Sequence, residues 1–398
     1  MHLRYYENDL GKLNLYKRGK AMKNYDIAAF IWPSYTGDEP RTRIFWPEGY
    51  GEWQTVKAMT DKGYKGCRWP RKPLWGYVNE ADSRIMEMQI DCAKSYGVNV
   101  FIYDWYWFDN RPFLENCLND GFLKAKNNKN MKFFLMWANH DATHLWDKRN
   151  SDSDLSTVIW KGAVTPEIFS NICDRTIEKY FSRKNYYMID GCPVYMIFDL
   201  DNFIRTFGNT EKCKEGIELF RKKTVDAGFR GLHFQVVHWG ERIYNWLPDE
   251  DINKGIDAYR LYDFLGIDSV TNYNWGGNVN FDGDYEELTE NYIATLEKAS
   301  ERLSVPYYPN ISVGWDNNVR FYNFMPGVVE NNTPENFRRA CERVKEFSDK
   351  SLSDGRMRAP LITVNSWNEW TETSYLQPDD LYGYGYLEAI REVFTEDK

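Results

Sequence analysis

Short apolar runs recur along the chain, and stretches with a helical spacing of apolar residues separate them. The runs are rich in β-branched and aromatic residues, which favours buried strands, and strands that alternate with helices predict a parallel sheet. Strands are expected at Tyr25–Trp32, Val98–Trp105, Lys132–Ala138, Val194–Phe198, Gly231–His238, Ile267–Asn272, Tyr307–Val313 and Leu361–Ser366. Eight strands are the number of a (β/α)8 barrel, so we predict an α/β fold of the TIM-barrel type with elaborated βα loops.

Helical stretches lie between these runs. They are expected at Ala81–Tyr96, Pro166–Phe181, Glu211–Ala227, Tyr285–Arg302 and Pro334–Ser351. Capping signals support two of them, because Thr165 and Thr333 each place a hydroxyl before a proline and an early acid. Gly97 and Gly228 follow two other stretches closely, which indicates helix ends.

The 398 residues contain no low-complexity linker and no internal repeat. Barrels often reach this length through insertions in their loops. We therefore predict an N-terminal extension at residues 1–24 and a single (β/α)8 catalytic domain over residues 25–398. The segment 38–79 is rich in Trp, Arg, Pro and Gly, and we expect it to be a βα-loop excursion over the barrel mouth.

Charge narrows the classes of partner. The chain carries 50 Lys and Arg against 59 Asp and Glu, a net charge of −9, which argues against nucleic acid or an anionic membrane. No apolar stretch is long enough to predict a membrane span. The first 24 residues lack the apolar core of a secretion signal, so we expect a cytoplasmic protein, or a periplasmic one if the sequence is a mature form. The spacing of the seven cysteines predicts reduced thiols, and no particular oligomeric state is predicted.

The residues just past the apolar runs share one character. In (β/α)8 barrels the active site lies at the carboxyl ends of the strands. Aromatic planes suit the apolar faces of sugar rings, and Asn, Asp and His supply hydrogen bonds. A single Trp is more often a packed core residue, but recurrence at nearly every strand end favours a carbohydrate cleft. The predicted substrate-binding residues there are Trp32, Asp104, Tyr106, Trp107, Trp137, Asn139, His140, His238, Trp239, Tyr273, Trp275, Trp315 and Asp316.

The last apolar run ends in two acids three residues apart, Glu369 and Glu372. Glycosidic bonds are cleaved by two carboxyl groups at one anomeric centre, one as acid and the other as base or nucleophile. A solvated helix face is the ordinary alternative for such spacing, but it would not directly follow a buried strand between tryptophans. We therefore predict Glu369 and Glu372 as the catalytic residues, facing one hollow. Their predicted substrate-binding neighbours are Trp367, Asn368, Trp370 and Tyr375.

For other polar groups the sequence leaves both a functional and a structural role open. Asp104 could orient substrate or pair with an arginine of the 38–79 segment. His140 and His144 have the spacing of a metal pair but no third ligand, so rim hydrogen bonding is favoured for His140. Asp199-Leu200-Asp201 is similar to the DxD with which nucleotide-sugar transferases hold a metal, although such a pair arises often by chance. No metal and no cofactor is predicted.

Six ordered blocks connect the chain with a known family. They are Gly51-Glu52-Trp53, Ala93–Val98 leading into Tyr106-Trp107-Phe108, Phe134–Asn139, Ile189–Val194, Ser312–Asn317, and Trp367–Glu372 followed by Tyr375–Asp379. In these blocks the chain resembles the WbsX-like proteins of polysaccharide gene clusters, which are grouped with glycoside hydrolase family 99, the endo-acting α-mannosidases and α-mannanases. The resemblance covers the chain after residue 24 and adds Glu52 and Trp53 to the predicted substrate-binding residues.

The resemblance implies a (β/α)8 barrel and metal-independent hydrolysis of an α-linked sugar with retention. By position, Glu369 would act as a base on the sugar 2-hydroxyl to form a 1,2-anhydro sugar. Glu372 would protonate the leaving group and later activate water. The chain departs from the family at His140, where a Glu is usual, and at Thr373, where a Gly is usual. The first departure puts mannose specificity in doubt, and the second alters the loop that holds Glu372.

The partner expected from these observations is an oligosaccharide or polysaccharide. Two rival functions remain at this point. A glycosyltransferase or accessory enzyme of surface-polysaccharide assembly would use Asp199 and Asp201 to hold a metal-bound sugar nucleotide. A catalytically silent barrel would bind a carbohydrate without turning it over.

Overall fold

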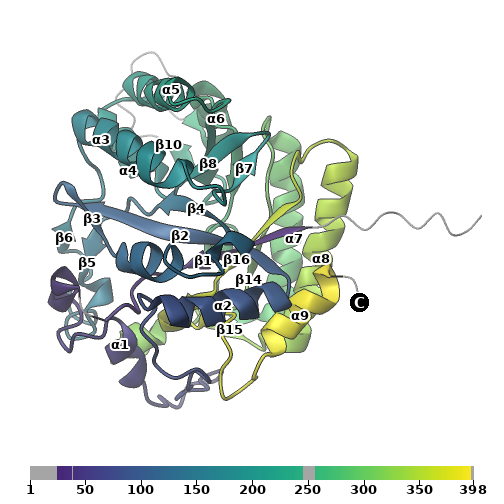
Figure 1. The fold of residues 1–398 in the computed structure, drawn as a ribbon. Helices are drawn as coiled ribbons and strands as arrows, with labels where there is room; N and C mark the ends of the chain where they lie inside the picture. Colours follow the sequence, from purple (N-terminus) through teal and green to yellow (C-terminus); the bar gives the residue numbers. More distant parts are fainter. Residues whose placement is uncertain (1–24, 38, 245–255, 396–398) are drawn as a thin grey trace, which may run out of the picture.

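The computed structural model describes residues 25–37, 39–244 and 256–395, and Figure 1 shows its parallel strands surrounded by helices. Eight parallel strands run in the order β12-β9-β8-β4-β2-β1-β16-β14. Their bounds are β1 Asp26–Ile31, β2 Val98–Phe108, β4 Lys132–Trp137, β8 Cys192–Ile197, β9 His233–Val237, β12 Ser269–Thr271, β14 Asn310–Ser312 and β16 Leu361–Asn365. Each coincides with one predicted run, so the predicted strands are confirmed.

The two edges of this sheet meet and nearly close the barrel. Val270 of β12 forms a parallel bridge with Tyr307, just before β14. The amide of Val270 donates to the carbonyl oxygen of Pro306 at 3.0 Å, and the amide of Tyr308 donates to that of Val270 at 2.9 Å. The (β/α)8 architecture predicted from the sequence is thereby confirmed.

The predicted helices are also present. Their bounds are α2 Ser83–Ser95, α3 Pro166–Thr176, α5 Thr210–Asp226, α7 Tyr285–Arg302 and α8 Pro334–Ser353, with α3 continuing into the π-helical turn η5 Ile177–Phe181. Thr165 and Thr333 cap α3 and α8 as predicted, because each hydroxyl accepts the amide three residues on, at 3.3 Å. The helices not predicted are α1 Trp53–Lys57, α4 Leu200–Phe207, α6 Ala258–Leu265 and α9 Gly385–Phe394. They are five to ten residues long, too short for a clear periodic signal.

Small elements fill the loops. The short strands are β3 Arg111–Phe113, β5 Ala142–Thr143, β6 Val158–Trp160, β7 Met188–Ile189, β10 Ile243–Tyr244, β11 Ile256–Asp257, β13 Gly283–Asp284, β15 Val329–Glu330, β17 Asn368–Glu369 and β18 Ser374–Tyr375. The short helical turns are η1 Pro40–Ile44, η2 Cys117–Phe122, η3 Asn128–Asn130, η4 His144–Trp146, η6 Trp275–Gly277, η7 Asn317–Arg320 and η8 Trp370–Glu372. These additions form the elaborated loops that the sequence predicts.

The segment 39–79 connects loops from different parts of the barrel. Arg41 donates to the carbonyl oxygen of Phe108 at the end of β2, and Lys62 donates to that of Asn318 after β14. The amide of Leu74 donates to the carbonyl oxygen of Pro378 after β16. The segment therefore crosses the carboxyl ends of the strands, as expected for an excursion over the barrel mouth.

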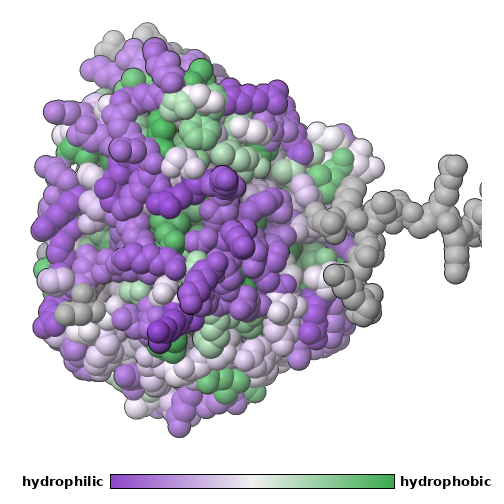
Figure 2. Space-filling view, viewed as in Figure 1, coloured by the Kyte–Doolittle hydropathy of each residue, from purple (hydrophilic) through white to green (hydrophobic). Residues whose placement is uncertain are grey.

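The face in Figure 2 is mainly hydrophilic, with hydrophobic residues scattered among polar ones. Within the described ranges no helix is long and apolar enough to cross a membrane. All seven cysteines are free thiols. The predicted N-terminal extension, residues 1–24, lies outside the described residues, and the single catalytic domain stays a prediction.

Candidate functional site

The two predicted catalytic acids lie on one tight hairpin that follows β16. Glu369 ends β17, which pairs antiparallel with β18, and Glu372 ends the turn η8 at the tip. Thr373 closes the turn with φ 55°, in the left-handed region that L residues rarely adopt. Glycine adopts this conformation at less cost than threonine does. The hydroxyl of Thr373 donates to the carbonyl oxygen of Asp316 at 3.0 Å and ties the hairpin to the loop after β14.

A buried polar network holds the base of this hairpin. The side chain of Asn368 pairs with both backbone groups of Trp32, each at 2.8 Å. The same amide donates to Glu80 at 2.8 Å. Burial raises the pKa of Glu80 to about 7, although its hydrogen bonds from Gln377, Gln89 and Asn368 act in the opposite direction. The hairpin is therefore anchored to β1 and to the start of α2 before any substrate is present.

Both carboxylates converge on a single guanidinium, that of Arg320. Its Nη2 donates to Glu369 Oε1 at 2.9 Å, and its Nη1 donates to Glu372 Oε1 at 2.9 Å. Glu52 approaches the same group, with its Oε1 3.5 Å from Arg320 Nε. The hydroxyl of Thr371 lies within hydrogen-bonding distance of Glu52 at 3.1 Å and of Glu369 at 3.0 Å. Three acids and one arginine thus form one buried cluster.

Glu52 reaches this cluster because of a close backbone approach. Gly51 has φ 65°, and a Cβ on it would lie 1.9 Å from the carbonyl oxygen of Ser34, so only glycine fits. The approach places Glu52 beside β1, where it accepts hydrogen bonds from the indole of Trp32 and the hydroxyl of Ser34. Of the residues that the family resemblance added, Glu52 lies in the cluster. Trp53 packs on Tyr35, with ring centroids 4.1 Å apart.

The side chains of Glu369 and Glu372 are almost fully shielded from solvent. The side chain of Glu369 is 2% exposed and that of Glu372 is 12% exposed. Burial raises the pKa of Glu369 well above its usual range, and the charge of Glu372 raises it further, while Arg320 opposes the rise. Burial also raises the pKa of Glu372, and Arg320 opposes that rise through both its charge and its hydrogen bond. Two interacting carboxyls beside one cation titrate as a pair.

Asp104 lies beside the pair, on β2. It accepts a hydrogen bond from the hydroxyl of Tyr273 at 3.1 Å, and within the described residues it forms no ion pair with an arginine of the 39–79 segment. Burial raises its pKa well above the usual range, and the charge of Glu372 adds to the rise. Asp104 Oδ1 and Glu372 Oε2 are both buried without a hydrogen-bond partner in the structure. These two oxygens are free to accept hydrogen bonds from a ligand.

Part of the predicted aromatic rim gathers around the acids. Trp32 packs against Tyr106 at 5.6 Å, and His140 packs edge-on against Tyr106 at 5.6 Å. Trp146, which was not predicted, contacts all three rings from the turn η4. Burial lowers the pKa of His140, so its imidazole is neutral near pH 7. Trp107, the next residue of β2 after Tyr106, packs against Trp105 instead, is 8% exposed and has an unpartnered indole nitrogen.

Other predicted rim residues lie in packed surroundings. Trp137 stacks on Phe169 toward the helices, and Trp275 stacks on Tyr285 and Tyr292. The remaining contacts are Asn139 with the backbone of Asp199, His238 with Tyr262, Trp239 with Phe198, Trp315 with Phe281, Asp316 with Tyr64, Trp367 with Gln89, and Trp370 with Tyr375. Trp239 and Trp315 are partly exposed and are the most accessible of them. For all of these residues, contact with substrate stays a prediction.

The possible metal-binding acids have structural roles. Asp199 caps α4, because its carboxylate accepts the amide of Asn202 at 3.0 Å. Asp201 forms an ion pair with Arg242 at 3.2 Å. In the described part of the chain, no group of three or more His, Cys, Asp or Glu side chains is placed to hold a metal ion. The Asp199–Asp201 pattern is therefore accounted for by a helix start.

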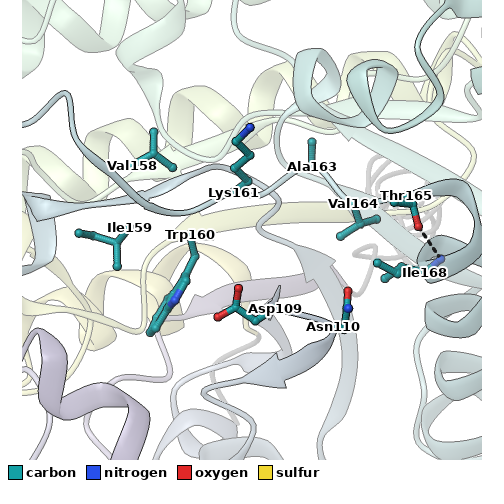
Figure 3. Close-up of a pocket in the computed structure, with 10 residues that line it drawn as sticks. All are labelled: Asp109, Asn110, Val158, Ile159, Trp160, Lys161, Ala163, Val164, Thr165 and Ile168. Atoms are coloured by element: carbon teal, nitrogen blue, oxygen red, sulfur yellow. Dashed lines mark hydrogen bonds between the residues drawn. The ribbon is translucent and has the colours of Figure 1, made fainter.

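An open hollow of about 510 Å³ lies elsewhere on the molecule. Figure 3 shows that it runs between the β2–β3 turn, at Asp109 and Asn110, and the segment from Val158 to Ile168, with Trp160 beside the turn. None of the residues predicted to bind substrate lines this hollow. Asp109 and Asn110 both have positive φ, as the two-residue turn of a hairpin requires.

Comparisons with known proteins agree with this architecture. The model of the family described as "Glycosyltransferase WbsX" matches residues 27–390. An uncharacterized protein WxcX of Xanthomonas campestris pv. campestris (strain B100) is 25% identical over 373 residues, 93% of this chain and 49% of that protein. The chain thus spans about half the length of the curated relatives it matches.

Solved structures resemble the chain in fold. A "glycoside hydrolase-like protein" is 14% identical, with a TM-score of 0.56 over 94% of this chain and 95% of that one. The GH99 endo-alpha-mannosidase from Bacteroides thetaiotaomicron, in complex with bis-tris-propane, is 12% identical, with a TM-score of 0.53 over 94% and 97% of the two chains. At these identities the likeness concerns the barrel fold.

Proposed function

The chain belongs to the family described as Glycosyltransferase WbsX, and from that premise we propose that it is a retaining glycoside hydrolase of an α-linked glycan. The observation that carries the proposal is the convergence of Glu369 and Glu372, from one hairpin, on one guanidinium. Glycoside hydrolases cleave their substrates with two neighbouring acidic side chains, and barrel enzymes carry their active sites at the C-terminal ends of the strands. The barrel fold shared with glycoside hydrolase structures is consistent with it.

The proposed reaction has two steps. In the first, Glu369 removes the proton of the sugar 2-hydroxyl, the oxygen attacks the anomeric carbon, and the glycosidic bond breaks. Glu372 gives its proton to the departing oxygen, and a 1,2-anhydro sugar forms. In the second, Glu372 takes a proton from water as the water attacks the anomeric carbon, and Glu369 returns its proton to the 2-oxygen. Two displacements at one carbon retain its configuration.

Burial of the pair suits both roles. A general acid must hold its proton, and burial favours a proton on the pair because it raises the pKa of both glutamates. Arg320 keeps negative charge available on the pair, which the base requires. The unpartnered oxygens of Asp104 and Glu372 would accept hydrogen bonds from sugar hydroxyls, which argues for a hydroxyl-rich ligand. An oligosaccharide or polysaccharide is the proposed substrate.

Substrate must pass the segments that cover the acids. Lys62 donates to the carbonyl oxygens of Asn318 and Phe321 at 2.7 and 2.6 Å, joining the 39–79 segment to the loop that carries Arg320. Because Glu369 is only 2% exposed, we propose that this contact opens to admit a sugar ring. We therefore include a closed resting state in the proposed function.

The test is product analysis with matched variants. The protein is incubated with a panel of α-linked glycans, products are separated by chromatography, and the anomer formed first is read by proton NMR. We expect cleavage with retention, abolished in Glu372→Gln and unchanged in Glu167→Gln, an exposed acid on α3. Full activity of a folded E372Q on a substrate that the wild type cleaves would remove Glu372 as the acid. Glycan binding that survives loss of both glutamates, with no turnover, would favour a silent binding barrel.

The description of the family favours a second candidate, a glycosyltransferase or accessory enzyme of polysaccharide assembly. It would need Asp199 and Asp201 to hold a metal-bound sugar nucleotide. Thermal denaturation with manganese and UDP tests it, because a ligand at a hundredfold its dissociation constant stabilises by about 2.7 kcal/mol. We expect no shift, since Asp199 already caps α4. A clear shift that Asp199→Asn removes would favour the transferase.

A further inference from the structure

Arg320 is the residue at the centre of the site that no pattern in the sequence indicates. It ends η7, in the loop between β14 and β15. Its own carbonyl oxygen accepts a hydrogen bond from Ser151 at 2.5 Å, and that of Val319 accepts one from Lys148 at 2.8 Å. Side chains from another βα loop thus hold the backbone of Arg320, independently of the acids that its guanidinium contacts.

The guanidinium is shared between the two glutamates. Arginine frequently binds one carboxylate with two parallel hydrogen bonds. Here the two terminal nitrogens bind different carboxyl groups, Glu369 and Glu372, both at 2.9 Å. Because both nitrogens belong to one planar group, they set the distance between the two oxygens that they bind. The Arg320 side chain is 4% exposed, so water does not replace these contacts.

Acidic groups outnumber cations around Glu369 and Glu372. The ionisable groups that face this pair are Glu52 at the start of α1, Asp104 and Tyr106 on β2, Tyr35 after β1, His140 after β4, and Tyr273 after β12. The tyrosines stay neutral because burial raises their pKa values well above 10, and burial lowers the pKa of His140. Arg320 is the cation that the described structure places in contact with these acids.

We propose that Arg320 is the positioning residue of this site: it fixes the separation of Glu369 and Glu372 and determines how many protons the pair holds. This inference rests on the proposed glycosidase function for its catalytic meaning, but not for its electrostatics. With the guanidinium present, one glutamate stays ionised while the other holds a proton, which is the combination that a base and an acid require. Without it, both glutamates stay protonated to higher pH and the base is lost.

Two substitutions of Arg320 separate charge from geometry. Arg320→Met removes both the charge and the two hydrogen bonds. Arg320→Lys keeps a positive charge but replaces the planar fork by a single ammonium on a flexible stem. R320M should therefore change both protonation and rate. R320K should preserve protonation and lower kcat, because the separation of the carboxyls is no longer fixed.

Infrared titration of the carboxyl bands, without substrate, tests the protonation directly. The bands of the pair are identified by their loss in Glu369→Gln and Glu372→Gln. We expect the titration midpoint to rise by roughly 1 to 3 pH units in R320M, the effect of removing a neighbouring opposite charge. Glu52→Gln removes a like charge and should lower the midpoint. Arg149→Met, whose guanidinium binds Asp147 instead, should leave it unchanged.

Opposite shifts in R320M and E52Q also exclude general loosening of the site, which would move both variants in the same direction. On a glycan that the wild type cleaves, the acid limb of the kcat/KM profile should move to higher pH in R320M and stay in place in R320K. An unchanged midpoint in a folded R320M would overturn the proposal. If R320M does not fold, wild-type kcat in R320K, or an unshifted E52Q, would overturn it.

The infrared result does not depend on finding a substrate. If the wild type cleaves no glycan but R320M and E52Q shift the midpoint in opposite directions, the glycosidase function fails and the electrostatic role of Arg320 stands. If the wild type cleaves a glycan and the midpoints do not move, the role of Arg320 fails and the glycosidase function stands.

Discussion

Thr373 and Asp316 are joined by a hydrogen bond of 3.0 Å from the hydroxyl of one to the carbonyl oxygen of the other. The bond ties the hairpin that carries Glu369 and Glu372 to the loop that carries Arg320. It also accompanies a strained residue, since Thr373 has φ 55°. A left-handed conformation costs an L residue about 1 to 2 kcal/mol. The hydroxyl contact offsets part of that cost.

Substitutions at Thr373 separate the two effects. Thr373→Gly relieves the strain but loses the hydrogen bond, worth about 1 kcal/mol, so its free energy of unfolding should stay close to that of the wild type. Thr373→Val keeps the strain and loses the bond, and should unfold about 1 to 2 kcal/mol more easily. Urea denaturation measures both. A T373V protein as stable as the wild type would show that the hydroxyl anchors nothing.

Glu80 should make stability depend on pH. Its folded pKa of about 7 lies above the ordinary carboxyl value, so the folded protein binds more protons than the unfolded chain between these values. Its contribution to stability is therefore complete below the unfolded pKa and is lost as pH rises through about 7. The advantage of the wild type over Glu80→Gln should fall by on the order of 3 kcal/mol from acid to neutral pH.

Thermal or urea denaturation of wild type and E80Q at several pH values measures this difference. Taking the difference removes the opposing effect of His238, whose pKa burial lowers to about 4. Glu167→Gln, on the exposed face of α3, is the matched control. A constant E80Q difference across this range would show that Glu80 binds its proton equally well in the folded and unfolded protein.

Lys62 should control how tightly the site is covered. Its ammonium donates to carbonyl oxygens on both sides of Arg320, and hydrogen bonds to a charged group contribute about 1.5 to 3 kcal/mol each. Lys62→Met should increase amide hydrogen exchange in residues 317–325 by at least about tenfold, with little change in the barrel strands. Lys57→Met, on the same excursion but packed over Tyr50 and Tyr77, is the control. Equal amide exchange in K62M and K57M would show that the Lys62 hydrogen bonds do not hold this loop in place.

The two acids of the DxD pattern should differ in their effect on stability. Asp199→Ala removes a helix cap and should destabilise by about 1 kcal/mol. Asp201→Asn breaks a partly exposed ion pair with Arg242 and should cost less than about 1 kcal/mol. Denaturation curves compare the two. A reversed order would mean that the interpretation of this segment as a capped helix is wrong.

The fold was largely predictable because its signals are local. Strand and helix positions follow from apolar spacing, and the starts of α3 and α8 follow from Thr165 and Thr333. The continuation of β2 to Phe108 was missed, although Asp109 and Asn110 are residues that favour the two-residue turn between the strands of a hairpin. Short helices such as α4 were missed because one or two turns carry too few apolar positions to show a period.

The site was predictable only in part. Glu369 and Glu372 are close in sequence, so a motif reveals them, and the Gly51-Glu52 block pointed to Glu52. Arg320 lies in an irregular loop, and its place is set by Lys148 and Ser151 from a distant segment. No spacing rule connects such residues. Burial of tryptophans such as Trp275 likewise depends on packing between elements. The sequence alone therefore does not distinguish a buried tryptophan from one exposed at the rim of the barrel.

The joint between β12 and Tyr307 differs from the other joints of the barrel. It consists of one bridge and two backbone hydrogen bonds, whereas each of the other neighbouring strand pairs shares at least three residue pairs. The barrel is therefore expected to open first at this contact, which has the fewest backbone hydrogen bonds. Deuterium should enter the amides of Val270 and Tyr308 earlier than those of β1 and β2, and mechanical or thermal opening of the wall should begin there.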